Sequence, residues 1–342
     1  MGESSTGPDA PPHPAGQQGV PPPPEVLTFG RSGVDLYPLQ IGVGLEDVQS
    51  FGKFLGGTTA NVAVAAARLG RRAAIVTGVG DDPFGRFVRR ELVRLGVDDA
   101  FVVLSHDHPT PITFCEIFPP DDFPLWFYRR PTAPDLEIRP EDLDLDAVAG
   151  AGLLWISATG LSVEPSRSAH HRALDVRIRR GRPGAPTVLD LDHRPSFWAD
   201  PADARREVSQ VLDRVTVAVG NRAECEVAVG ETDPDRAADA LLAAGVELAV
   251  VKLGPAGVLA KTSRERVVVA AVPVTTLNGL GAGDGFGGSL AHGLLAGWPL
   301  ETVLSRANAA GALVASRLEC STAMPTAAEI DALLTGAAVP VR

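Results

Sequence analysis

The sequence predicts an α/β fold built on one doubly wound, largely parallel sheet covered by helices. Short β-branched stretches alternate along the chain with longer stretches whose apolar residues recur at helical spacing, and this alternation is typical of parallel sheets. The chain has 342 residues, of which 45% are hydrophobic. That composition can supply the core of a single large α/β domain.

The alternation defines the expected elements in chain order. Strands are expected at 26–30, 73–78, 153–158, 187–192, 216–220 and 248–254. The helices between them include 58–70, 84–96 and 234–245, and the C-terminal third is expected to form the successive helices 282–296, 300–316 and 326–335.

Two stretches, 36–55 and 109–130, interrupt this alternation. Aromatic and β-branched residues cluster there without helical spacing, so we expect antiparallel strands inserted into the fold. Such an insertion either covers a ligand site at the carboxyl ends of the parallel strands or is a plain surface hairpin. Residues 1–24 contain eight prolines and are expected to be a disordered arm, which leaves 25–342 as the folded domain.

Charge and composition narrow the class of function. The formal net charge of −11 would repel nucleic acid and acidic membranes, so we expect small-molecule partners instead. Three widely spaced cysteines fit neither a disulfide framework nor a metal site and favour a reducing cytoplasm. The sequence shows no secretory signal and no apolar run of about 18 residues, so we expect an unexported protein.

The glycine-rich stretch NGLGAGDGFGGSL, 278–290, carries one acid, Asp284. We expect a loop that enters a helix with Gly281, Ala282 and Gly283 at its first turn, where free amides and the helix dipole favour an anion such as phosphate. An acid beside such a site can take a proton from a hydroxyl that attacks a phosphoryl group. Alternatively, Asp284 only complements the helix dipole.

Two further segments allow both a functional and a structural interpretation. The stretch VKLGPAG, 251–257, ends in a turn that could flank a nucleotide or could be an ordinary hairpin turn. Asn221 and Glu224, which follow a strand, suit a Mg²⁺ ion that keeps its water shell, and they suit a helix cap equally well.

A group of residues near the N-terminus is equally open. The group offers a carboxylate, the backbone amides of two glycines and a side-chain carboxamide, which can all hydrogen-bond to a polyhydroxy ligand. Each of these residue types is also common in turns and helix caps. The group consists of Asp35, Gly56, Gly57 and Asn61.

In combination these motifs resemble those of the ribokinase-like (PfkB) carbohydrate kinases. GGTTANVAVAAARLG (56–70), GDDPFG (80–85), NRAE (221–224) and GLGAGDGFGGSLAHGLL (279–295) follow the family's order and spacing, and the resemblance covers residues 26 to about 335. It implies a three-layer sandwich with a small β-lid, here the segments 36–55 and 109–130. It also implies ATP as phosphoryl donor and Mg²⁺.

The resemblance assigns roles residue by residue. Asp284 takes the role of base, and the amides of Gly281, Ala282 and Gly283 form the anion hole. The sugar hydroxyls are held by Asp35, Gly56, Gly57 and Asn61. The nucleotide is held by Asn221, Lys252, Gly254, Gly257 and Asn308. Mg²⁺ is held through water by Asn221 and Glu224.

Within the family, several stretches resemble members that phosphorylate a sugar acid in inositol catabolism rather than ribokinase: 30–57, 113–129 and 316–326. A substrate carboxylate calls for cations, and arginine binds it bidentately. Tyr128, Arg129 and Arg194 resemble the positions with which 2-keto-3-deoxygluconate kinases, the alternative activity, hold their acid. Either arginine could instead pair with Asp190 or Asp192.

Two positions depart from the family pattern. Asn278 replaces an acid that helps many relatives to hold a monovalent cation, which leaves potassium activation open, and Lys252 replaces a threonine.

Apolar lid residues such as Phe114, Ile117 and Phe127 suit either a homodimer formed through the lid or packing on the parent domain. A non-catalytic sugar- or nucleotide-binding regulator would lack the acid of the glycine loop, but Asp284 is present. A dinucleotide oxidoreductase would carry G-x-G-x-x-G after its first strand, where this chain has GRSGVD (30–35). The sequence therefore favours neither alternative.

Overall fold

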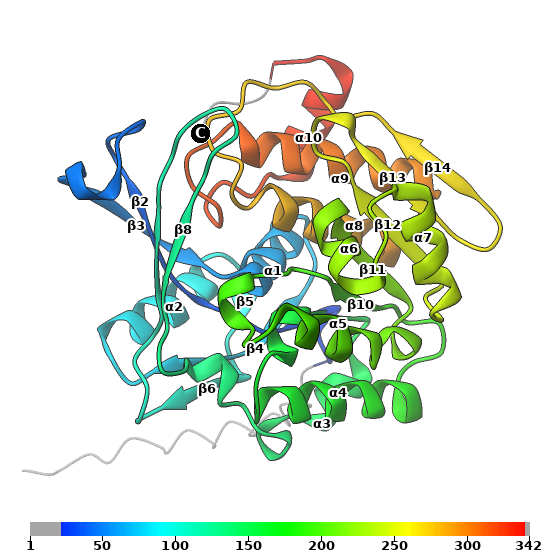
Figure 1. The fold of residues 1–342 in the computed structure, drawn as a ribbon, viewed down its shortest axis with the longest axis horizontal. Helices are drawn as coiled ribbons and strands as arrows, with labels where there is room; N and C mark the ends of the chain where they lie inside the picture. Colours follow the sequence, from blue (N-terminus) through cyan, green and yellow to red (C-terminus); the bar gives the residue numbers. More distant parts are fainter. Residues whose placement is uncertain (1–21, 339–342) are drawn as a thin grey trace, which may run out of the picture.

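The structure is a computed structural model that describes residues 22–338, so the arm expected at 1–24 lies, apart from 22–24, outside the described residues. A ten-stranded sheet forms its centre, in the order β14–β13–β12–β11–β10–β9–β1–β4–β5 with β6 also on β4 (Figure 1). The strands are β1 (Val26–Phe29), β4 (Ala73–Gly80), β5 (Val97–Asp98), β6 (Val102–Ser105), β9 (Leu153–Ser157), β10 (Thr187–Asp190), β11 (Val217–Asn221), β12 (Leu248–Lys252), β13 (Val258–Lys261) and β14 (Arg266–Val269).

The sheet is parallel from β5 to β12, and only β13 and β14 run antiparallel. Its six central strands coincide with the six expected ones, because a parallel strand covered on both faces is a short, continuous apolar run. Leu153 of β9 lies opposite Val26 of β1, and Leu154 lies opposite Thr187 of β10. The carboxyl ends of β1, β9 and β10 therefore meet at one edge.

Helices cover both faces of the sheet and confirm the expected α/β sandwich. On one face, the core includes residues of α1 (Thr58–Arg68), α2 (Pro83–Arg94), α8 (Ala282–Ala296) and α9 (Leu300–Ala315). On the other it includes residues of α3 (Leu145–Gly150), α4 (Ser166–Arg180), α5 (Pro201–Ser209), α6 (Arg222–Val229) and α7 (Pro234–Ala243), while α10 (Ala327–Thr335) packs on α9. None of the described helices combines the length and apolar character needed to cross a membrane.

A second, four-stranded sheet, which we call the small sheet, projects to one side (Figure 1). It contains β2 (Gly33–Pro38), β3 (Phe51–Gly56), β7 (Ile112–Cys115) and β8 (Leu125–Tyr128). The pairs β2–β3 and β7–β8 are antiparallel, but β2 and β7 run parallel. The expectation of antiparallel strands alone was therefore wrong for this pair. Strand β2 follows β1 in the chain, and β7 follows β6. Because β1 and β6 both run parallel to β4, β2 and β7 leave the main sheet in the same direction.

Candidate active site

The first turn of α8 lies between two pockets. Gly281 is the N-cap and has φ 77°, a left-handed conformation that favours glycine, and a Cβ there would also lie only 2.6 Å from Cys320 Sγ. Gly281 and Asp284 line the first pocket, whereas Ala282 and Gly283 line the second. A single helical turn thus contributes to both pockets.

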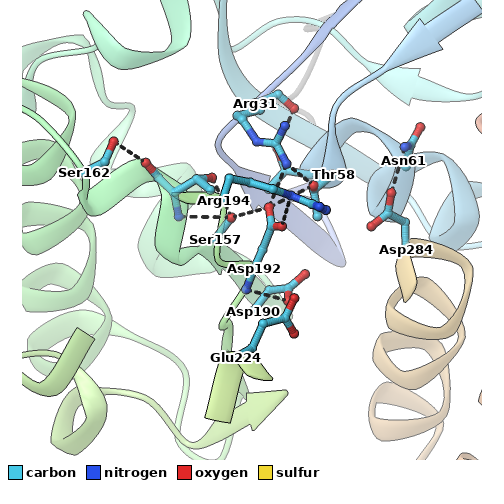
Figure 2. A network of polar contacts seen from close by, with 12 residues as sticks. Arg31, Thr58, Asn61, Ser157, Ser162, Asp190, Asp192, Arg194, Glu224 and Asp284 are labelled. Atoms are coloured by element: carbon cyan, nitrogen blue, oxygen red, sulfur yellow. Dashed lines mark hydrogen bonds and ion pairs between the residues drawn. The ribbon is translucent and has the colours of Figure 1, made fainter. Parts of the chain in front are cut away.

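Asp284 projects from α8 toward α1, where Asn61 Nδ2 donates a 2.8 Å hydrogen bond to its Oδ2 (Figure 2). Burial raises the pKa of Asp284 to about 7, against the opposing effect of the Asn61 hydrogen bond. A carboxyl group with such a pKa is suited to accept a proton near neutral pH. The other amide atom, Asn61 Oδ1, is buried without a hydrogen-bond partner among the described residues.

The first pocket contains most of the residues expected to hold a sugar. Asp35, Gly57, Asn61 and Arg194 all line it. Gly56 does not, but a Cβ on Gly56 would lie 2.1 Å from Asp35 Cγ, so the glycine makes room for this carboxyl group. Burial raises the pKa of Asp35 to about 6.

Tyr128 and Arg129 lie outside the first pocket, contrary to expectation. Alternate side chains of a strand point to opposite faces, and on β8 it is Leu125 and Phe127 that line the pocket. Tyr128, one residue on, is 67% exposed. Arg129 is held in a buried ion pair with Asp135 at 2.8 Å.

Arg31 was missed by the sequence analysis and lines the first pocket. It is buried, and its Nη2 lies 2.7 Å from Asp192 Oδ2 and donates to Thr58 Oγ1. The available signal was its position immediately after the strand 26–30, where the carboxyl end of a central parallel strand reaches the ligand edge of the sheet.

The second pocket is larger, with a volume of about 590 Å³. Lys252, Gly254, Gly257 and Asn308 line it, as expected of nucleotide contacts. The turn that contains Gly254 and Gly257 connects β12 to β13 in an antiparallel hairpin, so the structural interpretation of this segment as a hairpin turn is confirmed. Asn308 Nδ2 donates to the carbonyl oxygens of Val269 and Ala270.

Lys252 is the one cation among the described residues that line the second pocket, and it lies beside the first turn of α8. A Cβ on Gly283 would lie 3.4 Å from Lys252 Nζ, which is itself 3.8 Å from Glu224 Oε2. Burial alone would lower the pKa of Lys252, but the surrounding carboxyl groups, Glu224 and Asp190 foremost, together raise that pKa. Burial raises the pKa of Asp190 itself to about 8.

Asn221 and Glu224 form a reciprocal helix cap at the start of α6, with hydrogen bonds of 2.6 and 2.9 Å. Neither lines the two pockets, and between residues 22 and 338 no group of three or more His, Cys, Asp or Glu side chains is arranged to hold a metal ion directly. Asn278 is buried; its Nδ2 donates to Leu318 O, and its Oδ1 accepts from Leu280 N.

Comparison with known proteins defines the class. The pattern of the pfkB family of carbohydrate kinases matches residues 24–327. The 5-dehydro-2-deoxygluconokinase of Bacillus subtilis (strain 168) is 30% identical over 314 residues, 91% of this chain and 95% of that protein. The enzyme of the same name from Photobacterium profundum is 33% identical over 310 residues, 88% and 92% of the two chains.

A solved structure agrees with these sequence relatives. A double-mutant fructokinase from Vibrio cholerae O395, with fructose, ADP and a potassium ion bound, is 27% identical and superimposes with a TM-score of 0.81 over 92% of this chain and 99% of its own. The fold and these relatives define the class as a carbohydrate kinase, a phosphotransferase. The chain belongs to the PfkB family of carbohydrate kinases.

Proposed function

We propose that this kinase transfers a phosphoryl group from ATP to the terminal hydroxyl of 5-dehydro-2-deoxy-D-gluconate, in the cytoplasm and as a step of myo-inositol catabolism. The observation that carries the proposal is the first turn of α8, with Asp284 facing the first pocket and Ala282 and Gly283 facing the second. The sugar acid occupies the first pocket and ATP the second. The names of the curated relatives support the choice of substrate.

Residues of the first pocket bind and orient the sugar acid. Asp35, Gly57 and Asn61 hold its hydroxyl groups, and Gly56 leaves space for the Asp35 carboxyl. The Arg194 guanidinium binds its carboxylate. The small sheet, built largely from the two expected lid segments, acts as the lid, since β8 presents Leu125 and Phe127 to this pocket.

Asp284 is the general base of the transfer. As the terminal hydroxyl oxygen attacks the γ-phosphorus, its proton passes to Asp284, the bond from that phosphorus to the β,γ-bridging oxygen breaks, and ADP leaves. No covalent phosphoenzyme is formed. The amides of Gly281, Ala282 and Gly283 and the Lys252 ammonium face the negative charge that develops on the transferred group.

Lys252, Gly254, Gly257 and Asn308 hold the nucleotide. Asn221 and Glu224 would hold Mg²⁺ through water, and the bound ion would supply positive charge against the phosphates. The donor set fits this role, since Mg²⁺ retains water molecules and takes carboxylate and carbonyl oxygens. Glu224 also lies 3.8 Å from Lys252 Nζ, beside the second pocket.

A panel of acceptors tests the proposal. ADP release is followed with 5-dehydro-2-deoxygluconate, 2-keto-3-deoxygluconate, fructose and ribose. Phosphorus NMR then determines which carbon of the product carries the phosphate. We expect the first compound to give the highest kcat/KM and a phosphate on its terminal carbon. A maximum with 2-keto-3-deoxygluconate would reassign the substrate, a maximum with ribose would refute the carboxylate argument, and nucleotide binding without any transfer would indicate a non-catalytic regulator.

A further inference from the structure

Two arginines of the first pocket share one buried carboxylate. Asp192 Oδ2 lies 2.7 Å from Arg31 Nη2, and Asp192 Oδ1 lies 2.8 Å from Arg194 Nε. Asp192 is 3% exposed, and the two guanidinium groups hold its pKa well below the usual value. Two positive charges and one negative charge give this cluster a net positive charge, which also acts on the Asp35 carboxyl of the same pocket.

Arg31 is fixed in place by more than its ion pair. Its guanidinium lies 5.7 Å from the ring centre of Phe127 and 5.3 Å from that of Phe197, distances at which a cation is attracted to an aromatic face. The residue is 6% exposed, and its Nε is buried without a hydrogen-bond partner in the described part of the chain. A buried donor without an acceptor is costly, so the position of Arg31 beside the pocket carries an energetic cost.

The first pocket is polarised. Figure 2 shows Asp284 and Asn61 on one side and the cluster of Arg31, Asp192 and Arg194 on the other. The other acid that lines the pocket is Asp35. An open-chain sugar acid has the same polarity, because its carboxylate and its terminal hydroxyl are at opposite ends of the carbon chain.

We propose that Arg31 and Arg194 together form the binding site for the substrate's carboxylate, with Asp192 as the positioning residue that holds both guanidinium groups. The inference rests on the proposed function and refines it, since it assigns to Arg31 the role that the sequence suggested for Arg129. It also defines the acceptor class as sugar acids long enough to reach from this cluster to Asp284.

The test compares the sugar acid with an analogue in which CH₂OH replaces the carboxylate. The ratio of their kcat/KM values is measured for the wild type, R31Q, R31K and, as a control, R129Q. Arg129 also lies in a buried ion pair and against Phe197, but it is outside the first pocket. We expect R31Q to lower the ratio by about ten- to a hundredfold, R31K to lower it less, and R129Q to leave it unchanged.

Each outcome has a distinct meaning. Equal losses with acid and analogue in R31Q would show that Arg31 only supports Asp192, and the inference would be wrong. If R31Q does not fold, R31K decides, because lysine keeps the charge beside Asp192 but loses the planar fork; an unchanged ratio in R31K overturns the inference. A wild type without preference for the acid would refute the proposed substrate class itself.

Discussion

The ring of Phe123 lies against Gly279, at the start of the glycine-rich loop: a Cβ on Gly279 would be 2.9 Å from Phe123 Cε2. Phe123 belongs to the loop between β7 and β8, and it lines the second pocket together with Pro120 and Asp121. The adjoining strand β8 lines the first pocket through Leu125 and Phe127. One hairpin of the small sheet therefore contributes to both pockets.

Replacing Phe123 by alanine should weaken nucleotide binding. We expect F123A to raise the KM for ATP several-fold, because the ring lines the second pocket, proposed to hold ATP, and packs on the loop that enters α8. The KM for the sugar acid should rise through the same hairpin. Steady-state kinetics with each substrate varied in turn measure both effects. Y128A is the control: Tyr128 is exposed on the opposite face of β8, and its loss should change neither constant.

Replacing Asp284 by asparagine should remove the base while keeping the shape of the site. General-base assistance is typically worth about 10²- to 10⁴-fold, so D284N should lose kcat by that order, while ATP affinity in equilibrium binding stays within a few-fold of the wild type. E301Q is the matched control, since Glu301 is an exposed acid in the first turn of α9. A D284N enzyme that keeps a near-normal rate would show that the acid only complements the helix dipole.

The rate should depend on the ionisation of Asp284. Its pKa is raised to about 7, and the base must be deprotonated, so kcat/KM should be constant above that pH and fall about tenfold per unit below it. The Asn61 hydrogen bond lowers this pKa, so N61A should move the acidic limb to higher pH. A pH–rate profile of both proteins checks this, and a limb that stays in place in N61A would contradict the assignment.

Alanine at Gly281 should cost stability beyond the cost of its backbone conformation. Gly281 and Gly297 both have positive φ, 77° and 67°, but only at Gly281 would a Cβ meet another group, Cys320. We expect G297A to lower the free energy of unfolding by about 1 kcal/mol and G281A to lower it more and to reduce kcat. Urea unfolding of the two variants measures the difference, and equal losses would mean that the contact with Cys320 relaxes freely.

The sequence was sufficient for the six central strands of the main sheet and for the local motifs, but not for residues whose position depends on pairing between distant segments. The central strands are continuous apolar runs, and the turn with Gly254 and Gly257 carries its own signal. Tyr128 was misplaced because a shift of one residue reverses the face of a strand, and that face is set by the pairing of β7 with β8.

Arg31 shows that a contact between distant segments of the chain is not predictable from local sequence. It is a single arginine in a short loop, and no spacing connects it with Asp192, which lies 161 positions further along the chain. The two meet because β1 and β10 flank β9 in the sheet, and this order cannot be deduced from local pattern. The small sheet shows the same limit, since its parallel β2–β7 pair follows from the order of the main sheet.

The hairpin shared by the two pockets has a consequence for turnover. In the proposed function the sugar acid lies under β8 and ATP lies under Phe123, so both substrates contact the same hairpin and each helps to order the cover over the other. With only the nucleotide bound, the hairpin would lack its contacts with the sugar acid, and the site around the γ-phosphate would be incompletely assembled. We therefore expect idle hydrolysis of ATP to be slow, and the departure of either product to loosen the hold on the one that remains.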